Sequence, residues 1–171
     1  HLRRLEVIAD YAAVIDHAEA AAMLAERLDD TPHQIELALR CGSAHTWRSE
    51  RDQAARWLEG GLARARTAGL PRMEAACHAQ LGSFYFEGVD YPRAQAHYTQ
   101  SLELSRAHHY LPAQSDALSG LGILTATQGD DLAGRTYFES ALALARQMGD
   151  RMRESRAINN LAATLQALGE L

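Results

Sequence analysis

Hydrophobic and small residues recur along this chain at a spacing of 40 positions and in a constant order. One column of the repeat is apolar and occurs at Cys41, Leu81, Leu121 and Leu161. The next column is small and occurs at Gly42, Gly82, Gly122 and Ala162. Two later columns hold Ala54, Ala94 and Gly134, and then Leu58, Tyr98 and Phe138. A fixed period of this kind predicts an array of stacked units, in which each unit buries its apolar face against its neighbours.

Each unit is predicted to be a helical hairpin, with a tight turn between its two helices. The second helix begins at an acidic N-cap, at Glu50, Asp90, Asp130 or Glu170. Second helices are expected to end near Gly69, His109 and Gly149, and prolines 32, 71 and 112 to begin the next first helices. The expected helices are 2–13, 16–29, 32–47, 50–68, 71–87, 91–109, 112–128, 131–148 and 151–168.

Composition agrees with a helical, globular protein. The chain has 171 residues, of which 47% are hydrophobic and 23% charged. All 17 basic residues are arginine, which excludes Schiff-base chemistry and a P-loop lysine. The net charge of −5 disfavours nucleic acid as a direct partner. Without an apolar run of 18 residues we expect no membrane partner, and two cysteines favour a reducing compartment, the cytoplasm.

No motif in the sequence carries catalytic chemistry, so we predict that the chain is not an enzyme and holds no cofactor. Cys41 and His45 are four residues apart and could hold a metal ion. Both lie in columns that elsewhere hold leucine or tyrosine, so we expect core packing and no metal. The pair Gly120 and Gly122 lacks the third glycine and the preceding strand of a dinucleotide site.

The repeat resembles the tetratricopeptide repeat (TPR). The order Leu81-Gly82-x-x-Tyr85, followed by Ala94, Tyr98 and Ser101, carries the resemblance, and ranges 38–61, 118–150 and 157–162 match parts of it. Most TPR units have 34 residues. The 40-residue step is similar to long-repeat arrays in kinesin light chains, Pins-type adaptors and bacterial regulators such as MalT-like activators. The resemblance implies an all-α, right-handed superhelix of antiparallel helix pairs, with about nine helices.

The resemblance also implies a concave groove lined by the first helices, in which a protein or peptide binds. Carried over to this sequence, the groove residues are Arg40, Ser43, Trp47, Gln80, Ser83, Asp116, Arg156, Asn159 and Asn160, flanked by Glu36, Phe86, Ser119, Ile123 and Gln166. Asn159 and Asn160 are the chain's only asparagines. A carboxamide donates to and accepts from a peptide backbone at once, so these two suit an extended ligand, although Asn160 can equally bond a neighbouring helix.

Three functions are open at this point. The first is a non-catalytic peptide-binding module, the regulatory or interaction region of a larger bacterial protein such as a transcriptional regulator. The second is a scaffold or homo-oligomerisation module without a ligand groove. The third is a helical-repeat RNA reader, which the acidic balance disfavours. A stretch rich in arginine is an alternative docking surface, at Arg48, Arg51, Arg56, Arg64, Arg66 and Arg72.

We expect one array over residues 1–171, cut from a longer protein. Its units are expected at 1–31, 32–70, 71–110, 111–150 and, as a partial unit, 151–171. The last helix carries an apolar stripe at Ile158, Leu161, Leu165 and Leu168, for which the sequence contains no further helix. Such a stripe predicts a homodimer of the fragment through helix 151–168.

Overall fold

The computed structural model describes residues 20–21 and 29–170, and they are all-α. Seven helices follow one another: α2 (Thr31–Trp47), α3 (Arg51–Thr67), α4 (Pro71–Glu87), α5 (Tyr91–Ala107), α6 (Leu111–Thr127), α7 (Asp131–Met148) and α8 (Arg151–Ala167). Each begins within one residue, and ends within two, of its expected position. The expected count of nine is not supported, because the expected helices 2–13 and 16–29 lie outside the described residues, apart from two helical residues at 20 and 21.

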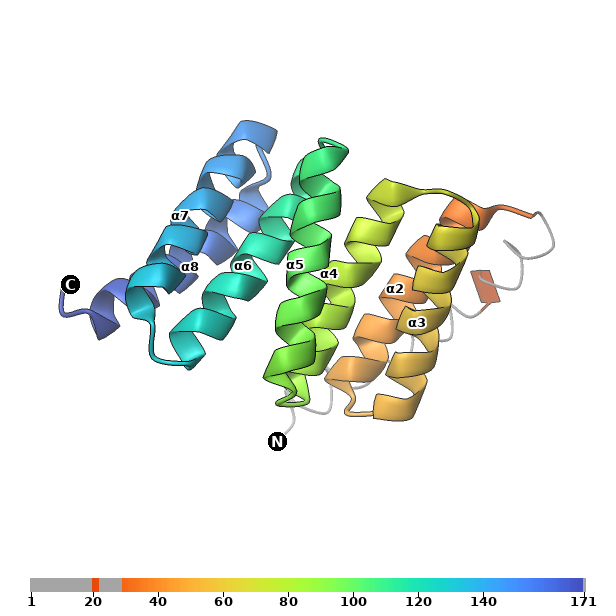
Figure 1. The fold of residues 1–171 in the computed structure, drawn as a ribbon, viewed down its shortest axis with the longest axis horizontal. Coiled ribbons are helices and arrows are strands. Elements are labelled where there is room, and N and C mark those ends of the chain that lie inside the picture. The colour runs from red at the N-terminus through yellow and green to blue at the C-terminus, as the bar shows by residue number, and fades with distance from the viewer. Residues whose placement is uncertain (1–19, 22–28, 171) are drawn as a thin grey trace.

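The helices pack as antiparallel pairs that stand side by side in one row (Figure 1). The pairs are α2 with α3, α4 with α5, and α6 with α7, and α8 packs on α7 and α6. We call α2, α4, α6 and α8 the A helices and α3, α5 and α7 the B helices. Consecutive A helices contact one another, whereas no contact joins α3 with α5 or α5 with α7. The A helices therefore form the inner, more tightly packed layer of the row.

The repeated glycine column sets the distance between the two helices of a pair. A Cβ atom built on Gly82 would lie 2.5 Å from Cδ1 of Tyr98, and one on Gly122 would lie 2.6 Å from Cε1 of Phe138. Such distances are far inside van der Waals contact, so any larger residue would push the helix axes apart. The large residue opposite is buried in each case. The column of small residues and the column of large residues therefore meet where the two helices of a pair pack, and we call this contact the seam.

A residue with left-handed backbone conformation ends each helix. Gly69, His109 and Gly149 have φ of 63°, 50° and 67°, which confirms the predicted ends of the B helices. The predicted acidic N-cap is confirmed at two of the three B helices. Asp90 Oδ1 accepts from the Arg93 amide at 3.2 Å, and Asp130 Oδ1 accepts from the Ala133 amide at 3.0 Å. Glu50 makes no cap bond.

Glu50 instead accepts from His45 Nδ1 at 2.6 Å and from Arg48 Nη2 at 2.8 Å, so its carboxylate closes the turn before α3. His45 and Cys41 are buried in the core, as predicted, and Cys77 is buried as a free thiol. Burial raises the pKa of Cys77 to about 12, which keeps its sulfur protonated and unreactive. No helix in the described residues has both the length and the apolar character of a membrane span.

Candidate functional site

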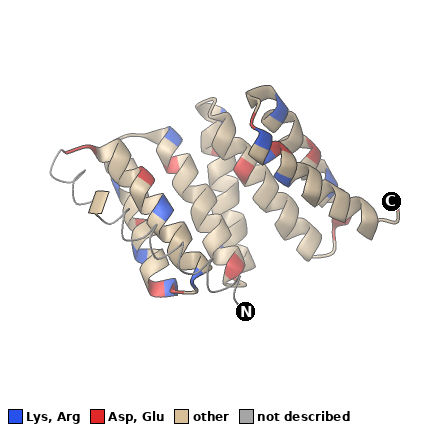
Figure 2. Cartoon of the chain, turned by 180° about the vertical axis from the view of Figure 1, so that it is seen from behind, with Lys and Arg blue, Asp and Glu red and all other residues tan. Residues whose placement is uncertain are grey.

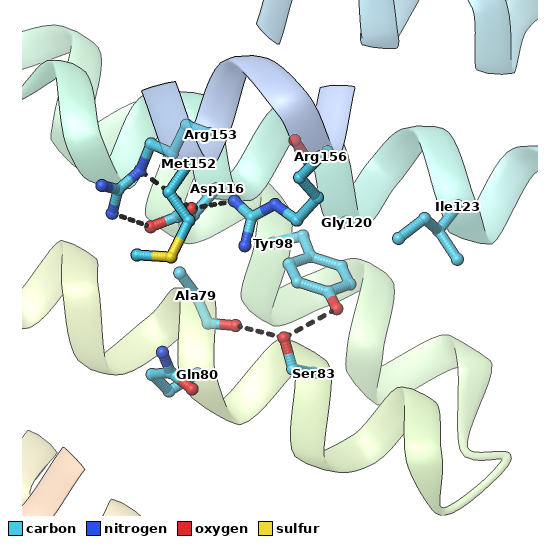
Figure 3. Close-up of a pocket in the computed structure, with 11 residues that line it drawn as sticks. Ala79, Gln80, Ser83, Tyr98, Asp116, Gly120, Ile123, Met152, Arg153 and Arg156 are labelled. Carbon is cyan, nitrogen blue, oxygen red and sulfur yellow. Dashed lines mark hydrogen bonds and ion pairs between the residues drawn. The ribbon is translucent and has the colours of Figure 1, made fainter. Parts of the chain in front are cut away.

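The inner layer carries a hollow of about 390 Å³ between α4, α6 and α8 (Figure 3). We call it the central hollow. Three consecutive A helices line it, with one residue of the B helix α5 among them. Its lining consists of Ala79, Gln80 and Ser83 from α4, Tyr98 from α5, Asp116, Ser119, Gly120 and Ile123 from α6, and Met152, Arg153 and Arg156 from α8. Polar side chains from helices distant in sequence thus meet at one place.

Gly120 lines the central hollow and makes room there for the ring of Tyr98. It lies in the repeat column that holds Arg40, Gln80 and Asn160 in the other A helices. A Cβ atom on Gly120 would collide with the aromatic ring of Tyr98, which extends from α5 between α4 and α6. Because glycine has no side chain, the ring of Tyr98 fits against α6 and lies at the base of the hollow.

Hydroxyl groups of the central hollow form a short hydrogen-bonded chain. Tyr98 Oη donates to Ser83 Oγ at 3.2 Å, and Ser83 Oγ donates to the carbonyl oxygen of Ala79 at 3.3 Å. Burial raises the pKa of Tyr98, so its hydroxyl keeps its proton at neutral pH. Both hydroxyl protons are therefore engaged within the protein.

Asp116 joins α6 to α8 through two arginines. Its carboxylate accepts from Arg153 Nε at 3.2 Å and Nη2 at 2.8 Å, and it also pairs with Arg156 Nη2. Arg153 Nη1 donates to Asp150 Oδ2 at 2.6 Å. The bonds to Asp116 raise the pKa of Arg153 above its ordinary value. Two positive and two negative charges cancel here, and Figure 2 shows blue and red residues next to one another in this half of the row.

The structure brings four of the expected groove residues to the central hollow. These are Gln80, Ser83, Asp116 and Arg156, and the flanking Ser119 and Ile123 join them. Ser43 lies beside this set, because its Oγ donates to Gln80 Oε1 at 2.9 Å and so links α2 to α4. The other four line no part of it.

Arg40, Trp47 and Asn159 are exposed, and Trp47 keeps 66% of its surface. Asn160 lines a second hollow of about 300 Å³ between α6, α7 and α8, together with Phe138 and Thr164. The Nδ2 atom of Asn160 is buried and has no acceptor among the described residues. The alternative expectation, that Asn160 bonds a neighbouring helix through this amide, is therefore not met there.

The expected groove residues did not include five of the lining residues, namely Ala79, Tyr98, Gly120, Met152 and Arg153. Tyr98 belongs to the column of large residues that packs against the glycine column, but its hydroxyl reaches Ser83 in the inner layer. Two observations in the sequence point to the hollow. A glycine interrupts a column of long polar residues at position 120, and Asp116 and Arg156 are opposite charges in one column of successive A helices.

Solved structures resemble the whole row, although no protein-family model and no curated protein sequence matches the chain. BtubC (BKLC) from P. vanneervenii superposes with a TM-score of 0.73 at 20% identity, over 98% of this chain and 69% of that one. A Rap protein complexed with competence and sporulation factor superposes with a TM-score of 0.77 at 15% identity, over 96% of this chain and 49% of that one. A kinesin light chain-like protein of P. anserina superposes with a TM-score of 0.66 at 14% identity, over 98% of this chain and 83% of that one.

The chain has a TPR-like fold. The kinesin light chain-like neighbour is described as having nearly identical TPR-like repeats, and the likeness covers nearly all of this chain. This confirms the resemblance seen in the sequence. At these identities the likeness concerns the fold, which is typically non-catalytic.

A second polar cluster of the TPR-like protein lies in the joint of α3, α4 and α5. His78 Nδ1 is 2.8 Å from His97 Nδ1, and Arg66 Nη2 is 3.1 Å from His78 Nε2. A guanidinium only donates, so His78 accepts at Nε2, carries its proton on Nδ1 and donates to His97. Burial, with the nearby His97 and Arg66, lowers the pKa of His78 to about 4. Glu74 accepts from Arg66 Nε at 2.8 Å and completes the cluster.

These histidines form a neutral hydrogen-bonded pair. Tyr85 stacks on His97 with ring centroids 5.2 Å apart, which shields the pair from water. Nowhere in residues 20–21 and 29–170 do three His, Cys, Asp or Glu side chains come close enough to share a metal ion.

Proposed function

We propose that this chain is a non-catalytic module that binds a peptide segment of a partner protein along the inner layer of A helices. The observation that carries the proposal is the central hollow, where Gln80, Ser83, Asp116 and Arg156 from three A helices meet beside the buried ring of Tyr98. Ligand sites are concave and combine apolar surface with a few well-placed polar groups. The central hollow has this composition.

The mechanism is binding to a preformed surface. Helices fix the backbone of every lining residue, and bonds such as Ser43 to Gln80 and Arg153 to Asp116 fix side chains in advance. A site ordered before binding loses little conformational entropy when the ligand arrives.

The structural neighbours support this proposal at the level of the fold. The Rap protein was solved in complex with competence and sporulation factor, so one protein of this architecture holds a bound factor. This chain spans 49% of that protein. We extend the proposal to a regulatory or interaction region of a larger bacterial protein, such as a transcriptional regulator, in which the pairs continue as a right-handed superhelix and a bound ligand changes its pitch.

A blocking substitution tests the proposal. Heptapeptide mixtures, N-acetylated, C-amidated and fluorescently labelled, are titrated with the protein and followed by anisotropy. Ser83→Trp places an indole at the mouth of the central hollow and should weaken binding at least about tenfold. Thr99→Trp adds the same group to the exposed surface of α5 and should leave binding unchanged. Equal binding by both variants, or no binding by the wild type, would reject peptide binding at this place.

One observation favours a second function, homo-oligomerisation through helix 151–168. Ile158 is 42% exposed on α8, and Leu161 and Leu165 beside it are only half-buried. A contiguous apolar stripe of this kind is a common dimer contact. Ile158→Glu should then convert a dimer into a monomer in sedimentation experiments. A monomeric wild type at every concentration would exclude this function.

A further inference from the structure

Arg156 and Gln80 have hydrogen-bond donors left over in the central hollow. Arg156 has five N–H groups, and its bond to Asp116 uses Nη2. Its Nε and Nη1 atoms donate to no acceptor within residues 20–21 and 29–170, and its side chain is 50% exposed. Gln80 accepts from Ser43 through Oε1, so the two protons on its Nε2 are free in that same part of the chain. Figure 3 places Gln80 and Arg156 on opposite sides of the hollow.

Two acceptors of the same hollow, the Asp116 carboxylate and the Ser83 hydroxyl oxygen, are already engaged. Asp116 is shared by Arg153 and Arg156, and the Ser83 oxygen accepts from Tyr98. A cationic side chain entering the hollow would find its only carboxylate neutralised by two guanidinium groups. It would also have to lie beside Arg156, where like charges repel. The site is thus unsuited to lysine or arginine side chains.

We infer that the central hollow receives an acidic side chain of the bound peptide, whose carboxylate is held by Arg156 and Gln80. The inference rests on the peptide binding proposed above and names the residue class that this part of the layer selects. Ionised acceptors make stronger hydrogen bonds than neutral ones, and guanidinium offers paired N–H groups to a carboxylate. Arg156 remains paired with Asp116 through Nη2.

The test compares heptapeptide mixtures that differ only at the central position, fixed as Glu, Gln, Arg or Leu. Both ends are blocked, so the central side chain is the designed difference. We expect the Glu mixture to bind at least about fivefold more tightly than the Gln mixture at low salt, and the ratio to fall as salt screens the charge. The Arg mixture should bind most weakly. A further Gln mixture with a free C-terminal carboxylate separates an acidic side chain from a chain end.

Two variants that each remove one positive charge test whether Arg156 causes the preference for the Glu mixture. Arg156→Gln should bring the ratio of Glu to Gln affinity to about one. Arg151→Gln removes an exposed arginine from the same helix and should keep the preference. Helix content measured by circular dichroism shows that both variants are folded, because Arg153 still joins α8 to Asp116.

The outcomes separate the two proposals. If no mixture binds, peptide binding itself is wrong and the inference fails with it. If mixtures bind without a preference for Glu, or prefer Arg or Leu, peptide binding stands and the acidic class is wrong. A gain confined to the free C-terminus, or an equal loss of preference in Arg151→Gln, also overturns the inference.

Discussion

Single residues at the helix ends carry backbone strain that glycine would relieve. The left-handed position recurs every 20 residues, and Val89 occupies one of them with φ of 60°. A β-branched residue is poorly suited to this conformation, because its Cβ crowds the neighbouring carbonyl oxygen. Val89 is 69% exposed, so the side chain contributes little packing in return.

We expect Val89→Gly to raise the free energy of unfolding by about 1 kcal/mol, the balance of relieved strain and the larger entropy of an unfolded glycine. Urea unfolding measures it. The reciprocal change, Gly149→Ala at φ of 67° with open space around it, should lower stability by a similar amount. A Val89→Gly protein less stable than the wild type would show that this position is not strained.

The glycine column is the second place where one atom decides packing. Gly82→Ala puts a methyl group 2.5 Å from the Tyr98 ring, and we expect it to lower the free energy of unfolding by about 2 kcal/mol. Gly60→Ala is the matched control, because its Cβ would meet only the flexible end of Arg64, at 3.3 Å. That change should be neutral or stabilising by about 0.5 kcal/mol. Equal effects of the two substitutions would contradict the account of the seam.

At the scale of helices, the sequence predicted nearly every boundary described here, because caps and left-handed ends are local chemistry repeated at fixed spacing. The central hollow was predicted only in part. Gln80, Ser83, Asp116 and Arg156 follow from the A-helix columns, whereas Tyr98 belongs to a B helix. The Tyr98 side chain reaches the inner layer because it passes between Gly82 of α4 and Gly120 of α6. This position depends on how three helices pack together, so a column of the sequence does not predict it.

The histidine pair predicts how the joint of α3, α4 and α5 responds to acid. The pKa of His78 is about 4 in the folded protein, against about 6.5 in an unfolded chain. Between these values the unfolded state binds more protons, so stability falls as the pH decreases from about 6.5 toward 4. We expect His78 to contribute about 2 kcal/mol to the stability lost between pH 7 and pH 5.

The measurement is the change in unfolding free energy between these two pH values in the wild type and in His78→Gln. The change should be smaller in the variant, while His108→Gln, at an exposed histidine, should behave as the wild type. His97, Arg66, Glu74 and Arg93 also face or flank the pair, and their contributions are common to the wild type and the control. An imidazole of His78 that titrates near pH 6.5 by NMR would contradict the prediction.

At the scale of the whole molecule, each helix contacts only near neighbours in the row, so stability is a sum of local terms. Helix α6 buries nine residues, whereas α8 buries only Ala157 and Thr164. We expect amide hydrogens of α8 to exchange faster than those of α6, by hydrogen exchange and mass spectrometry. Protection of α8 that increases with protein concentration would instead indicate a dimer through this helix.

The most direct test of peptide binding along the inner layer is an amide NMR titration with the tightest-binding heptapeptide. The account predicts that shifts concentrate around Gln80, Ser83, Gly120 and Arg156, with the exposed faces of α3, α5 and α7 unchanged. Shifts confined to the B helices or to the Arg-rich stretch around α3 would contradict it, as would a spectrum that no peptide changes.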